Sequence, residues 1–219
     1  MARRRLLTLA LLLPLTPGLK REQTRIFEGV FGVFDDSLPD GWGRLLTDRY
    51  FRAKGRAPET LTALERLAFV GSRGPGALCY GPAGEPDDAQ DAALDLAAVA
   101  QQAERIASGS PEEALPALQA AGVSSSGSRP KVSVAFNPKT NTIMAAAETP
   151  LPGFEHWIVK FRAKEDPEDS GAVEEAYAEM ARSAGVVVPP TRLVETKGVG
   201  FSGCGASTSG AGPGSTPTR

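Results

Sequence analysis

The sequence predicts an α+β fold in which a mostly helical first half precedes a second half built on an antiparallel sheet. Apolar residues recur at helical spacing between residues 40 and 108, whereas they alternate with polar residues from residue 131 onward. The stretch from Gly198 to Arg219 consists mainly of Gly, Ser, Thr and Pro, which is typical of disordered segments. We therefore expect a helical region, a sheet region and a disordered tail.

The first predicted helix lies between Asp40 and Gly55. Aspartate is a favoured N-cap residue, and glycine can end a helix in the left-handed conformation. The apolar residues between them recur at helical spacing and are Leu45, Leu46, Tyr50 and Phe51. This pattern predicts a short amphipathic helix.

Three further helices are expected in the first half. Thr62 and Glu65 have the spacing of a capping box, and the helix that they begin should end at Gly71. After a turn-rich segment at 81–86, a third helix from about residue 95 to residue 108 is marked by Leu96, Val99, Ala103 and Ile106. Pro111 is expected to begin a fourth helix.

The second half predicts a hairpin, a strand and a helix. Val132, Val134 and Phe136 alternate, 137–140 has turn composition, and 142–146 should return as the antiparallel partner. Residues 156–161 are rich in β-branched and aromatic residues and predict a further strand. A helix is then expected over 170–184, with Ala172, Tyr177 and Met180 as its packing residues, followed by an extended return over 186–194.

The composition excludes several classes of function. Lys and Arg number 24 against 26 Asp and Glu, so no basic excess points to nucleic acid. Cys79 and Cys204 lie far apart without a CxxC pattern, and His156 is the only histidine, which leaves neither a zinc site nor a Ser-His-Asp triad. A disulfide between the two cysteines stays open, because two thiols also fit a reducing cytoplasm.

The N-terminal segment imitates a secretory signal, since Arg3 to Arg5 precede an apolar run from Leu6 to Leu15. The run is too short to span a bilayer as a helix, and it contains Pro14. No clean small-x-small cleavage site precedes Pro17, which favours a strand or core segment. We expect a cytoplasmic protein, with export as the alternative.

One succession of elements carries the candidate chemistry: a Gly/Ser loop at 124–131, a hairpin, a strand with Lys160 and a helix with Glu174. A glycine-bearing loop lets backbone N–H groups approach phosphates, a strand lysine neutralises their charge, and a helix glutamate can orient that lysine. Each element alone is more often a turn, a solvated lysine or a surface glutamate. The glycine pattern at 71–76 follows a helix, not a strand, and is interpreted as a structural turn.

Residues 33–43, with the sequence VFDDSLPDGWG, resemble the F-x-D-S-L-P-D-G-W-G signature of HipA-like serine/threonine kinases of type II toxin-antitoxin systems. The resemblance continues through 64–71, 73–78, 125–131 and 153–160, and it covers most of residues 28–197. It implies a protein-kinase-like small lobe preceded by a mostly helical HipA N-terminal domain. The implied activity is ATP-dependent phosphorylation of a protein serine or threonine, with ATP and Mg²⁺ as cofactors.

The resemblance also implies roles for individual residues. Lys160 is expected to contact the nucleotide phosphates, Glu174 to pair with it, and Ser124 to be the autophosphorylated loop residue, although Ser125 and Ser126 are not separable from it by sequence. The residues implied to bind ATP are Ser126, Gly127, Ser128, Arg129, Pro130, Lys131 and Lys160. A phosphate on the loop would disfavour ATP by charge repulsion.

The domain organisation implied by the resemblance is a partial HipA N-terminal domain at 1–117, a kinase-like lobe at 118–199 and a disordered tail at 200–219. The large lobe that supplies the catalytic aspartate and the metal ligands of such kinases is not recognisable, so we assign no catalytic residue and no metal ligand and expect an inactive fragment. The alternative is a non-catalytic remnant that binds nucleotide or the cognate HipB-like DNA-binding antitoxin. Neither direct nucleic-acid binding nor membrane binding is expected.

Overall fold

The computed structural model describes residues 18–19, 29–74, 78–81, 94–110, 116–122, 127–145, 152–196 and 199–205. Its helices are α2 (Gly32–Asp35), α3 (Gly41–Ala53), α4 (Ala63–Val70), α5 (Leu96–Ala107), α6 (Pro116–Gly122) and α7 (Ser170–Ser183), with a 3₁₀ turn at Pro58–Thr60. The strands are β1 (Lys131–Asn137), β2 (Thr142–Ala145), β3 (Glu155–Lys160), β4 (Thr191–Thr196) and β5 (Val199–Gly205). The described residues therefore form an α+β fold, as the sequence predicts.

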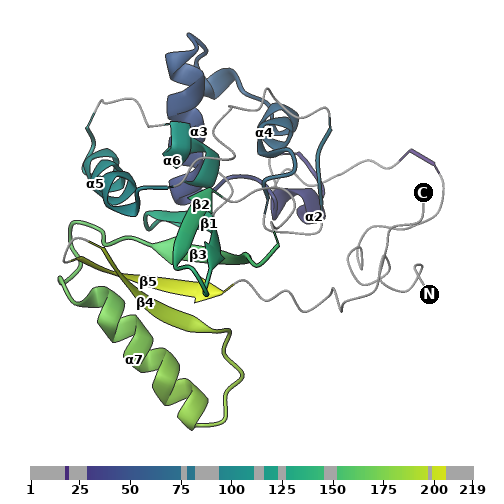
Figure 1. The fold of residues 1–219 in the computed structure, drawn as a ribbon. Helices are drawn as coiled ribbons and strands as arrows, with labels where there is room; N and C mark the ends of the chain where they lie inside the picture. Colours follow the sequence, from purple (N-terminus) through teal and green to yellow (C-terminus); the bar gives the residue numbers. More distant parts are fainter. Residues whose placement is uncertain are drawn as a thin grey trace.

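The five strands form one antiparallel sheet in the order β2-β1-β3-β5-β4. In Figure 1 the helices α3 to α6 lie on one side of this sheet, and α7 lies on the other, against β4 and β5. The sheet thus separates a helical layer from a single helix, and β3 occupies its middle.

One hydrophobic core joins the two halves of the chain. Trp42 and Leu46 of α3 pack in the same cluster as Val132 of β1 and Val159 of β3, and all four are buried. Burial of apolar surface is the main favourable term in folding, so the helical layer and the sheet stabilise each other.

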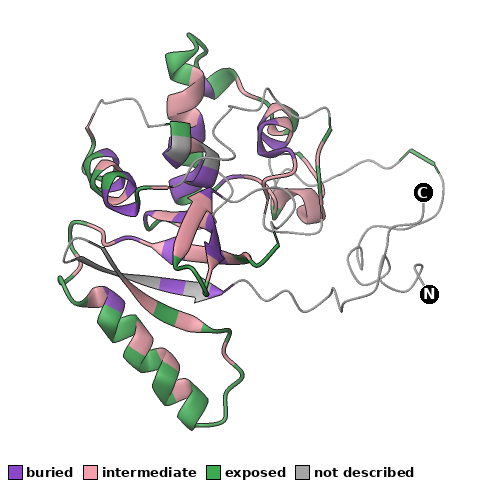
Figure 2. Ribbon diagram, viewed as in Figure 1, coloured by how far each residue is buried: buried purple, intermediate pink, exposed green. Residues whose placement is uncertain are grey.

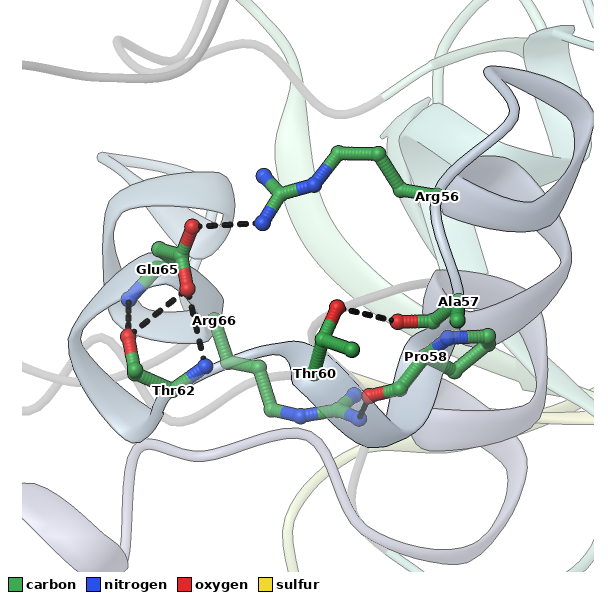
Figure 3. Close-up of polar contacts among 7 residues, drawn as sticks. All are labelled: Arg56, Ala57, Pro58, Thr60, Thr62, Glu65 and Arg66. Atoms are coloured by element: carbon green, nitrogen blue, oxygen red, sulfur yellow. Dashed lines mark hydrogen bonds and ion pairs between the residues drawn. The ribbon is translucent and has the colours of Figure 1, made fainter.

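The helix ends follow the sequence signals closely. In α4, Thr62 and Glu65 form the predicted capping box, in which Glu65 N–H donates to Thr62 Oγ1 at 3.2 Å and Thr62 N–H donates to Glu65 Oε2 at 2.9 Å. Arg56 also donates to Glu65, at 2.7 Å (Figure 3). The buried guanidinium of Arg66 donates to Pro58 O at 3.1 Å (Figure 3) and pairs with Asp48 at 2.7 Å, so its charge is compensated.

The capping box predicts a specific response to acid. Hydrogen bonds from the Thr62 backbone, then from the Arg56 and Thr62 side chains, lower the pKa of Glu65 from 4.5 to about 2. A carboxylate with a lowered folded-state pKa contributes stability that is present above its unfolded pKa and is lost as the pH falls through its folded pKa. The melting temperature should therefore fall more steeply in the wild type than in Glu65→Gln between pH 4.5 and about 2, as followed by circular dichroism. Parallel curves of melting temperature against pH would contradict this. Glu59→Gln is the control: the Glu59 carboxylate lies 3.8 Å from Arg52, and its removal should leave the wild-type slope unchanged.

The predicted packing face of α7 is wrong. Ala172 is exposed, and Tyr177 and Met180 are 66% and 55% exposed, so none of the three is a buried packing residue, and most of α7 is coloured as exposed in Figure 2. The side that faces the sheet carries Glu174 and Glu175 instead, which contact β3 and β4. Hydrophobic periodicity does not identify the face of α7 that contacts the sheet, because the contacts there are made by carboxylates.

The predicted disordered tail is corrected in its first part. Residues 199–205 form β5, which pairs with both β3 and β4. The physical reason is the indole of Trp157: a Cβ on Gly203 would lie 3.3 Å from Trp157 Cε3, so glycine leaves room for the ring. Any larger residue at position 203 would require the ring to move by a few tenths of an ångström. The remaining tail residues, 206–219, lie outside the described residues.

Other predictions agree in part. The third helix and the hairpin are confirmed, and the fourth helix is described at Pro116–Gly122, while Pro111 lies outside the described residues. The N-terminal basic and apolar run also lies outside them.

Cys79 has a free, exposed thiol. In the described part of the chain, no helix has the length and apolar character needed to cross a membrane.

Candidate functional site

Two lysines lie side by side on the sheet face that α7 covers. Lys131 of β1 and Lys160 of β3 are directly opposite in register, and directly opposed residues of antiparallel strands project on the same face. Lys160 Nζ lies 3.1 Å from Glu174 Oε2 of α7, so the structure brings these two side chains together. Both side chains are about two-fifths exposed (43% and 42%), so the pair contributes only ~0.2–1 kcal/mol to stability. Its main consequence is the fixed orientation of the lysine.

Lys131 is partly buried beside Lys160. Burial lowers the pKa of Lys131, the positive charge of Lys160 lowers it further, and the carboxylates of Asp40 and Glu174 oppose this shift. A pair of neighbouring ammonium groups creates a positive field that attracts anions. The arrangement is therefore suited to a ligand that carries several negative charges.

The loop before β1 bends directly beside these lysines. A Cβ on Gly127 would lie 2.8 Å from Lys131 Nζ, so the ammonium lies close over the bend, where Gly127 has a φ of 95°. Phe161 N–H donates to Pro130 O at 2.8 Å and joins the end of the bend to β3. The described part of the loop therefore lies next to the two strand lysines.

Arg129 has a more structural environment than the sequence suggests. Its guanidinium pairs with Asp166 at 2.7 Å, and the same carboxylate oxygen accepts the backbone N–H of Ala163 at 3.0 Å. Arg129 therefore ties the loop to the segment after β3. Of the other implied loop residues, Ser128 is exposed and Pro130 is buried, whereas Ser124 and Ser126 lie outside the described residues.

A cavity of about 330 Å³ opens between α7 and the sheet next to the lysine pair. Its lining residues are Lys160, Glu174, Glu175, Tyr177, Ala178, Thr191 and Gly203. Glu175 Oε1 accepts from the hydroxyl of Thr191 at 2.8 Å, while Glu175 Oε2 is buried and has no hydrogen-bond partner among the described residues. Sequence reasoning missed Glu175 and Thr191, because only their proximity in the fold identifies them.

Sequence reasoning also missed the segment that holds the loop from the helical layer. Asp40 was expected to cap α3, but its side chain makes no capping bond and instead accepts the N–H of Gly127 at 2.7 Å. Trp42 N–H donates to Gly127 O at 2.9 Å. Asp40 and Trp42 both lie in the family signature at 33–43, and this motif was the only feature of the sequence that singled them out.

The described residues include no group of three or more His, Cys, Asp and Glu side chains placed to hold a metal ion.

Comparisons with known families match the chain in two places. The model of the HipA N-terminal domain matches residues 2–81, including the basic and apolar run, and the model of the HipA-like C-terminal domain matches residues 123–203, including the loop, both lysines and most of β5. Neither match covers the predicted boundary between residues 117 and 118, so that boundary stays a prediction. Comparisons with curated proteins and with solved structures give no significant match.

Proposed function

Since this chain is a HipA-like protein, we propose that its sheet region binds the phosphates of ATP and forms the nucleotide-holding half of a serine/threonine kinase site. The observation that carries the proposal is the ion pair between Lys160 of β3 and Glu174 of the following helix, at 3.1 Å. In protein kinases a lysine on the third strand contacts the nucleotide phosphates and pairs with a glutamate of the next helix. The same two residue types occupy the same two elements here.

The loop supports the same proposal. In kinases a glycine-bearing loop covers the phosphates, and here Gly127 lies under the ammonium of Lys131. We propose that Ser126 to Lys131 form this contact through the charge of Lys131 and through loop backbone N–H groups other than those of Gly127, which Asp40 accepts, and of Pro130, which has none. Ser124 is proposed as an autophosphorylation site, because about two added negative charges in a phosphate-binding loop would disfavour ATP by charge repulsion.

The proposal separates binding from transfer. Phosphoryl transfer also requires magnesium ions that bridge the phosphates and a base that positions the acceptor hydroxyl. Mg²⁺ is proposed as a companion of ATP, held through the phosphates, and no residue of this chain is assigned to it or to the base. Non-catalytic nucleotide binding, the inactive form of this function, would use the same site.

We expect ATP to bind more tightly than ADP, and adenosine to bind at least about tenfold more weakly than ATP. A hydrogen bond to a charged group contributes ~1.5–3 kcal/mol, and adenosine loses all such contacts with the two lysines. Isothermal titration calorimetry with the three ligands, with and without Mg²⁺, tests this. The affinity for ATP should also fall as salt is raised, because screening weakens exposed charge contacts. Equal affinities for ATP and adenosine, or no binding of either, would rule out a phosphate site.

The proposed partner is a HipB-like antitoxin, because proteins with HipA domains generally pair with one. A cytoplasmic location is proposed with it, since ATP is an intracellular nucleotide and the exposed thiol of Cys79 is free.

A further inference from the structure

The bend at Gly127 is held at both of its polar backbone groups by one short segment of the helical layer. Gly127 N–H donates to Asp40 Oδ1 at 2.7 Å, and Gly127 O accepts from Trp42 N–H at 2.9 Å. Asp40 is the N-cap residue of α3, so the first turn of this helix and the loop satisfy each other's backbone groups across 87 residues of sequence. Such an exchange fixes the peptide of Gly127 in one orientation.

Two further contacts make the same junction specific. Trp42 Nε1–H donates to Lys131 O at 2.8 Å, so the segment holds the loop at Gly127 and at its C-terminal end. A Cβ on Gly41 would lie 2.7 Å from the carbonyl carbon of Gly127 and 2.8 Å from Ser128 Cα, and Gly41 has a φ of 39°. No other residue type fits at position 41 without displacing the loop.

The anchor of this junction is rigid. Trp42 is 2% exposed and belongs to the main core, whereas Asp40 and the loop lie at the surface. A loop that is held in its binding conformation loses less conformational entropy when it takes up a ligand. The position of the loop is therefore set by a part of the chain that lies outside the kinase-like region.

We propose that the segment Asp40–Trp42 positions the nucleotide-binding loop, with Asp40 as a positioning residue that acts as a hydrogen-bond acceptor for Gly127 N–H. The inference rests on the proposed function, and it makes the N-terminal region part of the nucleotide site. The Asp40 carboxylate also opposes the lowering of the Lys131 pKa that burial and the charge of Lys160 cause.

The alternative role for Asp40 is competition, in which its carboxylate occupies an N–H that a phosphate oxygen would otherwise take. The two roles predict different effects of an Asp40→Asn substitution on ATP binding. Asparagine keeps a side-chain oxygen acceptor and removes the negative charge, so it preserves positioning and abolishes charge repulsion.

The test compares ATP dissociation constants of the wild type, Asp40→Asn and Asp40→Ala, with Asp36→Ala as a control that removes a neighbouring exposed carboxylate. Positioning predicts that Asp40→Ala weakens ATP binding about threefold to tenfold, because one hydrogen bond to a charged acceptor is lost, while Asp40→Asn and the control stay within about twofold of the wild type. Gly41→Ala should weaken binding at least as much as Asp40→Ala. Tighter binding by both Asp40 variants would overturn positioning in favour of competition, and unchanged binding by Asp40→Ala would overturn both.

A second readout does not depend on nucleotide. The amide hydrogen of Gly127 should exchange with solvent more slowly in the wild type and Asp40→Asn than in Asp40→Ala, as measured by nuclear magnetic resonance, with unchanged exchange in the core strands. If the wild type fails to bind ATP but this pattern is found, the proposed function fails and the loop anchor stands. Equal exchange rates in all three proteins would overturn the anchor itself.

Discussion

Replacing Lys160 with methionine is expected to weaken ATP binding by about 10- to 100-fold, because a charged hydrogen bond to a phosphate contributes ~1.5–3 kcal/mol. Methionine keeps the length and the apolar stem of the lysine, which lines the cavity between β3 and α7. The fold should therefore persist, since the ion pair that is lost contributes at most ~1 kcal/mol. Calorimetric titration with ATP, together with thermal melting, measures both quantities.

Two companion variants sharpen this experiment. Glu174→Gln should weaken ATP binding by only about twofold to fivefold, since it removes the charge that orients Lys160 and leaves the lysine in place. The Glu174→Gln substitution should have a smaller effect once Lys160 is methionine, because part of its influence passes through that lysine and the rest through Lys131. Lys139→Met removes the same charge from the exposed turn at the far end of β1 and should bind ATP as the wild type does. If Lys160→Met binds ATP as tightly as the wild type does, the proposed role of Lys160 is wrong.

Replacing Trp42 with alanine is expected to destabilise the protein by about 3–5 kcal/mol, the range for large-to-small aromatic substitutions in a core. The side chain is buried among residues of both halves of the chain, including Val132 and Val159. Its loss therefore removes contacts that join the helical layer to the sheet. Urea denaturation followed by circular dichroism measures the change in the free energy of unfolding.

Trp42→Phe separates packing from hydrogen bonding at the same position. Phenylalanine retains most of the apolar volume but cannot donate to Lys131 O, so we expect a loss of about 1–3 kcal/mol from the unsatisfied carbonyl. Tyr177→Ala, at an exposed position of α7, is the control and should change stability by less than about 0.5 kcal/mol. A Trp42→Ala protein as stable as the wild type would contradict the shared core.

Local signals were sufficient for much of the fold and part of the site. The capping box of Thr62 and Glu65, the periodicity of α5 and the alternation of β1 each depend on residues a few positions apart, and the structure agrees with all three. The pairing of Lys160 with Glu174 also followed from the order of a strand and the next helix, supported by a family resemblance. Short-range hydrogen bonding and side-chain spacing determine such features, so the sequence alone contains them.

Three features were decided only by tertiary structure. The glycines of 199–205 indicated disorder by composition, yet this segment forms β5 between β3 and β4, where Gly203 leaves room for the ring of Trp157. The outward face of α7 was set by carboxylates that contact β3 and β4. The side chain of Asp40 does not cap α3 but accepts the N–H of Gly127, 87 residues away. In each case the deciding partner is distant in the chain, and only the packing of the layers brings the two together.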